Sequence, residues 1–244
     1  MTLQKLMSLT RKGIDDFQMI EPGDTVCVCV SGGKDSLALV TAMAGLSKFH
    51  PAGFQVKALT ADLGFPEADY SPIARYMEEL GVEYHVEKTD IGTIVFDTRK
   101  EKNPCSLCSK MKRAVLCETA LKMGANKIAL AHHRDDLIET FLMNLFYAGR
   151  IDTFLPVTEL DKTGITVIRP FLYAEEKELV YFTSKNPMPV CPSGCPADKN
   201  TTREDIKGLI RALAKENPDI KAKIFGAVSR SGLLSRRKND TITL

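Results

Sequence analysis

Residues 31–36 form the run whose types and spacing point most directly to chemistry. The run consists of Ser31, Gly32, Gly33, Lys34, Asp35 and Ser36. It follows the apolar residues 25–30 and precedes the apolar residues 37–43, so a buried strand is expected to turn into a helix here. Two glycines let the backbone approach an anion closely, and a helix start offers N–H groups and the positive end of its dipole. An ordinary glycine-containing turn is the alternative, but the pattern favours a phosphate-binding site, which we call the phosphate loop.

Four of the seven cysteines fall into two closely spaced pairs. Cys105 and Cys108 form a C-x-x-C unit at the start of a predicted helix, and Cys191 and Cys195 form a C-x-x-x-C unit in a proline-rich stretch. A structural zinc site, a redox dithiol and an iron–sulfur cluster can all be built from such thiols. The spacing favours zinc or a cluster over a redox dithiol and leaves those two open. The other cysteines are predicted to pack inside a strand or a helix: Cys27, Cys29 and Cys117.

Acidic residues stand at two further strand ends. Residues 132–136, with the sequence His-His-Arg-Asp-Asp, lie at a predicted strand-to-helix turn, and Asp62 ends another predicted strand. Asp135 and Asp136 could simply cap the helix. Facing a phosphate loop across a sheet, however, they could hold Mg²⁺ on a pyrophosphate or act on a reacting base, and we favour this second interpretation.

Lys112 follows Cys108 by four residues, or about one helical turn. The two side chains should therefore share one face of the helix. A lysine on such a helix is usually only solvated. If the cysteines bind a cluster at the active site, Lys112 would instead direct its charge into the same pocket.

Short apolar segments alternate with amphipathic ones along the chain, which predicts an α/β fold with a parallel sheet covered by helices on both faces. Strands are expected at residues 25–30, 55–62, 83–86, 127–131 and 165–168, and helices at residues 71–80, 134–148 and 202–213. Ligands of such sheets bind beyond the carboxyl ends of the strands, so the phosphate loop, Asp62 and residues 132–136 can converge. We predict a lead-in helix in residues 1–24, a nucleotide-binding domain in 25–186, and a cysteine-containing loop with C-terminal helices and a basic tail in 187–244.

The composition is that of an ordinary globular protein, with 44% hydrophobic and 26% charged residues and a net charge of +2. Such a small net charge does not by itself indicate a nucleic-acid partner. No apolar run is long enough to span a bilayer and the N-terminus lacks a signal-peptide core, so a cytoplasmic protein without membrane contact is expected. Basic residues crowd the C-terminus, which alone is weak support for tRNA contact: Arg230, Arg236, Arg237 and Lys238.

Several motifs occur together in the order typical of one family. The phosphate loop, the C-x-x-C unit, residues 127–136 and the run Ile168-Arg169-Pro170 resemble the tRNA 2-thiocytidine synthetases, or tRNA-cytidine 2-sulfurtransferases. These enzymes belong to the iron–sulfur-dependent ATP pyrophosphatase, or PP-loop, superfamily. Residues 15–24 fit as well, and the similarity extends from about residue 3 to residue 216.

The resemblance implies a Rossmann-like adenine-nucleotide α-hydrolase fold, in which residues 25–186 are the PP-loop ATP-binding domain, with a small helical appendage. It also implies ATP, Mg²⁺ and a [4Fe–4S] cluster held by three cysteines. Cys105 and Cys108 match the first two ligands, and Cys195, five residues before Asn200, is assigned as the third. One extra residue between the second pair keeps Cys191 in contention. Related tRNA thiolases imply catalytic roles for Asp35, Lys112 and Asp136, while the phosphate loop and Asp62 are expected to bind the nucleotide.

The implied activity is the ATP- and cluster-dependent 2-thiolation of a tRNA cytidine at position 32 of the anticodon loop, through an adenylated base. Implied partners are tRNA and a sulfur donor, such as a persulfide derived from a cysteine desulfurase or sulfide, and a homodimer is compatible with the pattern. Residues 62–67 are shortened and the tail diverges, so a uridine-type base is an alternative target. A tRNA-cytidine amine ligase, for which a cluster is superfluous, and a zinc-stapled nucleotide-binding module are further alternatives.

Overall fold

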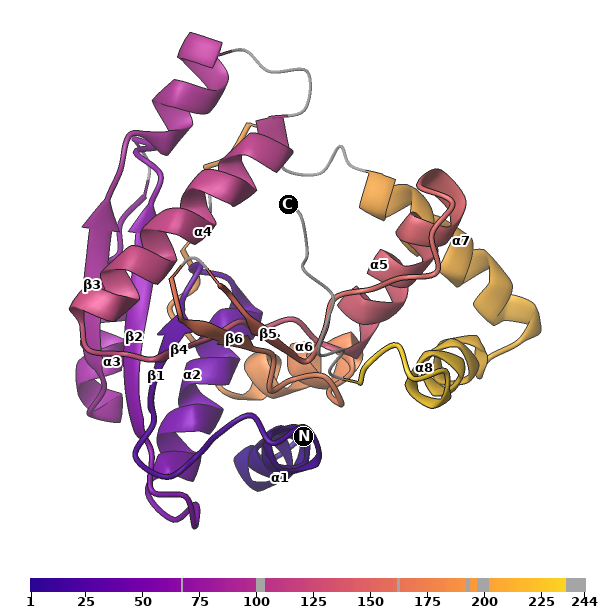
Figure 1. The fold of residues 1–244 in the computed structure, drawn as a ribbon, viewed down its shortest axis with the longest axis horizontal. Helices are drawn as coiled ribbons and strands as arrows, with labels where there is room; N and C mark the ends of the chain where they lie inside the picture. The colour runs from indigo at the N-terminus through magenta and orange to yellow at the C-terminus, as the bar shows by residue number, and fades with distance from the viewer. Residues whose placement is uncertain (67, 100–103, 162, 192–193, 197–201, 236–244) are drawn as a thin grey trace.

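The computed structural model describes residues 1–66, 68–99, 104–161, 163–191, 194–196 and 202–235, and a six-stranded sheet lies at its centre (Figure 1). The strands follow the order β3-β2-β1-β4-β6-β5 across the sheet. Their bounds are β1 Thr25–Cys29, β2 Gln55–Asp62, β3 Glu83–Lys88, β4 Lys127–Ala129, β5 Val157–Glu159 and β6 Thr166–Ile168. The strand that leads into the phosphate loop therefore lies inside the sheet, between β2 and β4.

The sheet is parallel except at one edge. β1 pairs in parallel with β2 and β4, β2 with β3, and β4 with β6, whereas β5 runs antiparallel to β6. The expectation of a wholly parallel sheet is wrong at this edge, where β5 was not predicted. β5 and β6 are three residues each, so neither is long enough for its hydrophobic alternation to be a strong signal.

Each face of the sheet is covered by helices, as expected for this α/β fold. Successive side chains of a strand point to opposite faces, and β1 shows this directly. Val26 and Val28 belong to a core packed by α1, α2, α3 and α6, whereas Cys27 and Cys29 belong to a second core packed by α4. The bounds of these helices are α1 Leu3–Asp16, α2 Lys34–Ser47, α3 Ser71–Leu80, α4 Pro104–Lys122 and α6 Glu176–Lys185. The predicted packing role of the strand and helix cysteines is confirmed.

The remaining helices form a group at the side of the sheet (Figure 1). α5 Arg134–Tyr147 packs against α7 Thr202–Glu216 and α8 Ile220–Arg230 through a small apolar cluster. This confirms the helical appendage. Because α5 starts at the carboxyl end of β4, the appendage is built directly onto the sheet edge where the candidate site lies.

Two further elements were missed by the predictions, and one predicted segment lies outside the described residues. α6 and the π-helical segment η1 Thr93–Arg99 were not predicted. The basic tail beyond residue 235 lies outside the described residues. Within the described part of the chain, every helix is too short or too polar to cross a membrane.

Candidate active site

The phosphate loop connects β1 to α2, as predicted. Gly33 is the N-cap residue of α2, and no side chain within the described residues caps this helix. The first N–H groups of α2 therefore point out of the carboxyl edge of the sheet without a side-chain acceptor. This is the arrangement in which the positive end of a helix binds an anion.

The two serines of the loop stabilise its shape. Ser36 is buried, and its Oγ donates a hydrogen bond to the carbonyl of Gly33 at 2.8 Å. The same oxygen accepts a hydrogen bond from the backbone N–H of Ser31 at 3.1 Å. The loop is thus closed by its own residues, without help from distant side chains.

Gly32 is required for a close approach between the phosphate loop and the cysteine-containing loop. Its φ is +86°, and a Cβ placed on it would lie 2.9 Å from the carbonyl oxygen of Cys191. The backbone N–H of Cys191 donates to the carbonyl of Gly32 at 3.0 Å. Any side chain at position 32 would therefore be strained and would displace the segment around Cys191.

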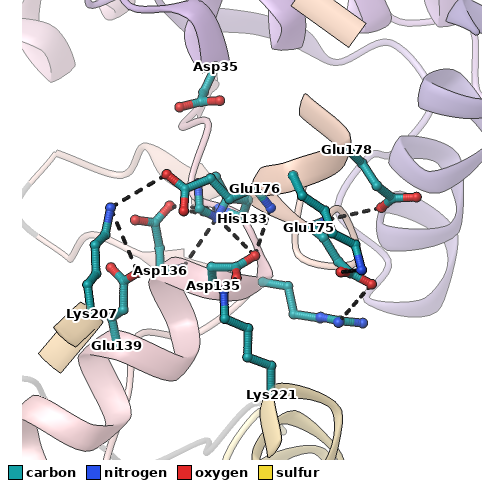
Figure 2. A network of polar contacts seen from close by, with 12 residues as sticks. Asp35, His133, Asp135, Asp136, Glu139, Glu175, Glu176, Glu178, Lys207 and Lys221 are labelled. Carbon is teal, nitrogen blue, oxygen red and sulfur yellow. Dashed lines mark hydrogen bonds and ion pairs between the residues drawn. The ribbon is translucent and has the colours of Figure 1, made fainter. Parts of the chain in front are cut away.

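Lys34 and Asp35 begin α2 and form an ion pair, with 2.7 Å between Lys34 Nζ and Asp35 Oδ2. Both side chains are about one-third exposed, at 33% and 28%. Figure 2 shows Asp35 above the polar group at the start of α5 and directed toward it. The structure thus brings Asp35 and the β4–α5 turn to the same side of the sheet.

Asp136 has the capping role that was the alternative to a catalytic one. Its Oδ2 accepts a hydrogen bond from the backbone N–H of His133 at 3.0 Å, and its own N–H donates to His133 Nδ1 at 3.3 Å. Its other oxygen, Oδ1, pairs with Arg203 Nη1 at 2.7 Å. The capping box is confirmed, and the catalytic role of Asp136 stays a prediction.

Asp135 is a buried structural carboxylate (Figure 2). Its Oδ1 pairs with Lys221 Nζ at 2.6 Å, and its Oδ2 accepts the backbone N–H of Glu176 at 2.7 Å. Burial works to raise the pKa of Asp135, but these hydrogen bonds outweigh it and hold the pKa below its usual value. Asp135 therefore ties α6 and α8 to the start of α5.

Three of the four paired cysteines interact electrostatically: Cys105 and Cys195 both act on Cys108. Cys105 is exposed at the start of α4, and Cys108 and Cys195 are partly exposed. Burial raises the pKa of the Cys108 thiol, Lys112 opposes this shift, and Cys195 and Cys105 add to it. Lys112 therefore interacts electrostatically with the Cys108 thiol, as its spacing predicted. Lys112 also acts on the buried Cys29 thiol at the end of β1.

Cys191 lies in a different environment from Cys195. It is buried against the phosphate loop, and its charge would act on Tyr70 and Tyr84. Asp62, at the end of β2, acts on the same two tyrosines and accepts the N–H of Gly64 at 3.0 Å. Asp62 and Cys191 thus act on the same pair of tyrosines, whereas Cys105 and Cys108 lie on α4 and Cys195 acts on Cys108.

Comparisons with known proteins agree on one family. Residues 5–210 match the PP-loop domain family. The tRNA-cytidine(32) 2-sulfurtransferase of Cupriavidus metallidurans is 40% identical over 229 residues, which cover 92% of this chain and 72% of the relative. The protein of the same name from Geobacter sulfurreducens is 37% identical over 228 residues, or 92% and 89% of the two chains. The chain belongs to the tRNA-cytidine(32) 2-sulfurtransferase family.

Solved structures outside this sulfurtransferase family share its fold. The U34-tRNA thiolase NcsA from Methanococcus maripaludis, solved with its [4Fe–4S] cluster, has a TM-score of 0.74 at 20% identity and covers 94% of this chain and 79% of its own. The NMN synthetase of Francisella tularensis has a TM-score of 0.54 at 11% identity, with coverage of 98% and 99%. At these identities the likeness concerns the fold, and it confirms the Rossmann-like PP-loop architecture.

Two arginines of this sulfurtransferase were not predicted as site residues, although both contact the β4–α5 turn. Arg203, at the start of α7, pairs with Asp136. Arg169, directly after β6, donates to His132. Arg169 occurs in the run Ile168-Arg169-Pro170 that supported the family resemblance, which was a signal for it. Nothing in the local sequence around Arg203 indicates its partner, because the two residues are 67 positions apart.

Proposed function

We propose that this chain uses ATP to thiolate C2 of cytidine 32 in tRNA. The observation that carries the proposal is the placement of a complete phosphate loop and a thiol group along α4 at the same carboxyl edge of the sheet, in a member of the tRNA-cytidine(32) 2-sulfurtransferase family. The loop supports activation of the base by a nucleotide. The thiols support delivery of sulfur.

In the activation step, the C2 oxygen of the cytidine attacks the α-phosphorus of ATP and pyrophosphate leaves. The N–H groups at the start of α2, together with Lys34, would stabilise the negative charge of the departing pyrophosphate. Asp35 faces the start of α5, where Asp136 lies, which supports a role for these two carboxylates in holding Mg²⁺ or in managing protons. Asp62 would contact the nucleotide from the other side of the loop.

The thiols along α4 suit an iron–sulfur cluster in chemistry. Cys105, Cys108 and Cys195 would hold it, because all three reach solvent and Cys105, Cys195 and Lys112 all act on the Cys108 thiol. Across the described residues, no three such donors are close enough together to hold a metal ion. Once bound, the cluster would supply an iron site that carries sulfur, and Lys112 would offset negative charge at the activated base.

Further parts of the proposal concern partners and organisation. The substrate tRNA would present the cytidine splayed out of its stack, as single-stranded loops allow. We further propose a persulfide or sulfide as sulfur donor, a cytoplasmic location, a homodimer, and a division into residues 1–24, 25–186 and 187–244.

The function is tested by mass spectrometry of tRNA nucleosides from a deletion strain, complemented with this chain or with its Lys34→Ala variant. We expect 2-thiocytidine to disappear on deletion, to return with the wild-type chain and to stay absent with the variant. Full 2-thiocytidine in the deletion strain would refute the substrate. Loss of a 2-thiouridine instead would establish the uridine alternative. A colourless, zinc-containing protein after anaerobic purification would refute the cluster.

A further inference from the structure

His132, the first residue of the β4–α5 turn, is held by a buried arginine. Arg169 Nε donates a hydrogen bond to His132 Nδ1 at 3.2 Å. The guanidinium is fixed in turn by hydrogen bonds to the carbonyl of Leu155 at 2.6 Å and to Thr158 Oγ1 at 3.2 Å. The ring of Phe154 lies 5.0 Å from Arg169 Cζ and packs against the imidazole. The position of the imidazole is therefore set from two sides.

This contact decides which ring nitrogen of His132 carries the hydrogen. An arginine has only donors and no acceptor, so Nδ1 must be the acceptor. In a neutral imidazole the hydrogen is then on Nε2. A reversed tautomer would place two N–H groups against each other in a buried contact.

His132 also stays neutral at physiological pH. Burial, and next the charge of Arg169, lower the pKa of His132 to about 4. Four charged or titratable neighbours act on it: Arg169, Arg203 and His133 favour the neutral ring, and Asp136 opposes them. The result is a neutral N–H donor, whose direction is fixed and which cannot become an acceptor.

The register of the sheet places His132 at the same edge as the phosphate loop. Ala129 of β4 pairs with Val28 of β1, so His132 and Ser31 each lie three residues beyond the paired positions, at the same edge. Nε2 of His132 has no hydrogen-bond partner within the described part of the chain, and it is not among the fully buried polar atoms that lack one. The donor is therefore open to a ligand at the active site.

We propose that His132 Nε2 donates a hydrogen bond to N3 of the target cytosine and thereby selects cytosine over uracil. This inference rests on the proposed function and names the group that reads its substrate. Cytosine N3 is an acceptor, whereas uracil N3 carries a hydrogen. A fixed donor satisfies the first base and faces a second donor on the other, and such a mismatch of polar groups discriminates strongly.

The same hydrogen bond assists the sulfur-transfer step. When a hydrosulfide sulfur forms the C–S bond at C2 of the O2-adenylated base, the electron pair of the C2–N3 double bond moves onto N3, and the S–H proton is lost to solvent. The C2–O2 bond then breaks, O2 leaves with AMP, and the pair on N3 re-forms the double bond. A neutral donor at N3 stabilises the charge while it is there, and Arg169 acts as a positioning residue that keeps the donor in place.

A chemical double-mutant cycle tests the contact by binding rather than by turnover. The probes are anticodon stem-loops with either cytidine or 3-deazacytidine at position 32, and 3-deazacytidine carries C–H in place of N3. Each is titrated into the wild-type protein and into His132→Ala in the presence of a non-hydrolysable ATP analogue. We expect each single change to weaken binding about tenfold and the combination to weaken it no further. Fully additive losses would overturn the proposal. His85→Ala, an exposed histidine on β3, is the control, and His132→Gln, which keeps a donor, should restore part of the affinity.

The tautomer is tested separately by ¹⁵N NMR of the histidine side chains. Wild-type protein should show His132 with Nε2 protonated and Nδ1 bare between about pH 5.5 and about pH 8. An Nδ1-protonated or a titrating ring would overturn the proposal without any variant that must fold. In Arg169→Met the pKa of His132 should rise, because one of its two leading causes is lost, but stay below the ordinary value because burial remains. The acid limb of the pH profile of thiolation should therefore move to higher pH, and in Arg169→Lys, which retains the charge and a donor, it should not. If the NMR result holds but the wild-type protein does not thiolate cytidine, the proposed function is refuted. The tautomer assigned to His132 is not affected by that outcome.

Discussion

The phosphate loop and the thiol group differ in how complete they are in the folded chain. The loop has its N–H groups, serine hydrogen bonds and left-handed glycine in place, all supplied within six residues or by one backbone contact to Cys191. Cys105, Cys108 and Cys195 share one electrostatic neighbourhood, yet within the described residues no metal-holding group is assembled. The phosphate loop is thus preformed in the folded chain, whereas the described thiols form no preassembled metal site.

The largest expected effect comes from removing a thiol of α4. In Cys108→Ala, thiolation should fall below about one-hundredth of the wild-type rate, because even supporting groups around metal ligands contribute 10- to 100-fold. ATP binding should be unchanged, since the loop owes nothing to α4 side chains. Nucleoside mass spectrometry and ATP titration measure the two effects. Cys117→Ala, which removes a buried thiol of the same helix, is the control. A Cys108→Ala protein that is still brown and active would show that Cys108 is not needed for the cluster or for thiolation.

The next effect separates the two cysteines of the proline-rich loop. Cys195→Ser should lose the visible absorbance of the anaerobically purified protein, while Cys191→Ser should keep it, because Cys195 acts on the Cys108 thiol, whereas Cys191 is buried and contacts the phosphate loop through its backbone. Absorption spectra and iron content of the two variants give the answer. The opposite pattern would assign Cys191 as the third ligand.

Gly32→Ala should damage the loop and spare the thiols. A left-handed conformation costs a residue with a Cβ about 1–2 kcal/mol, and this Cβ would also meet the Cys191 carbonyl at 2.9 Å. ATP affinity should therefore fall about tenfold or more. Gly53→Ala is the matched control, because Gly53 also has a positive φ and nothing lies within 4 Å of its added Cβ. Equal losses in both variants would attribute the effect to strain alone and not to the contact with Cys191.

The smallest effect concerns Glu139, at the seam between α5, which begins beside the loop, and α7, which follows Cys195 in the chain. Burial raises the pKa of Glu139 from 4.5 to about 7, although Lys207 opposes the shift (Figure 2). The folded protein thus binds this proton more tightly than the unfolded chain. The resulting stability is full below about pH 4.5, declines as the pH rises, and is lost above about pH 7.

Urea unfolding of the wild type and Glu139→Gln measures this contribution. Between about pH 5 and about pH 8 the free energy of unfolding of the wild type should decline relative to the variant by on the order of 1–3 kcal/mol. The exposed Glu118→Gln on α4 is the control and should show no such difference. If the free energies of unfolding of the wild type and Glu139→Gln changed in parallel with pH, Glu139 would not titrate in this range.

The two regions also differ in what the sequence could predict. The loop, its strand and its helix were predicted because each depends on local signals, namely apolar runs, two glycines and a helix start. The pairing of Asp136 with Arg203 was not, because it joins residues 67 positions apart across a helix seam. β5 was missed since three residues at an edge carry too short a pattern. The third cluster ligand was assigned to Cys195 by resemblance, and this assignment stays a prediction.

The position of β1 decides how long the nucleotide site survives as the protein unfolds. This strand has neighbours on both edges and a buried core on both faces, so its amides are reached by water only when the whole sheet opens. The appendage of α7 and α8 is attached through smaller clusters. In native-state hydrogen exchange the base of the phosphate loop therefore belongs to the slowest-opening unit, and partly opened forms that have released the appendage still carry an intact cradle for ATP.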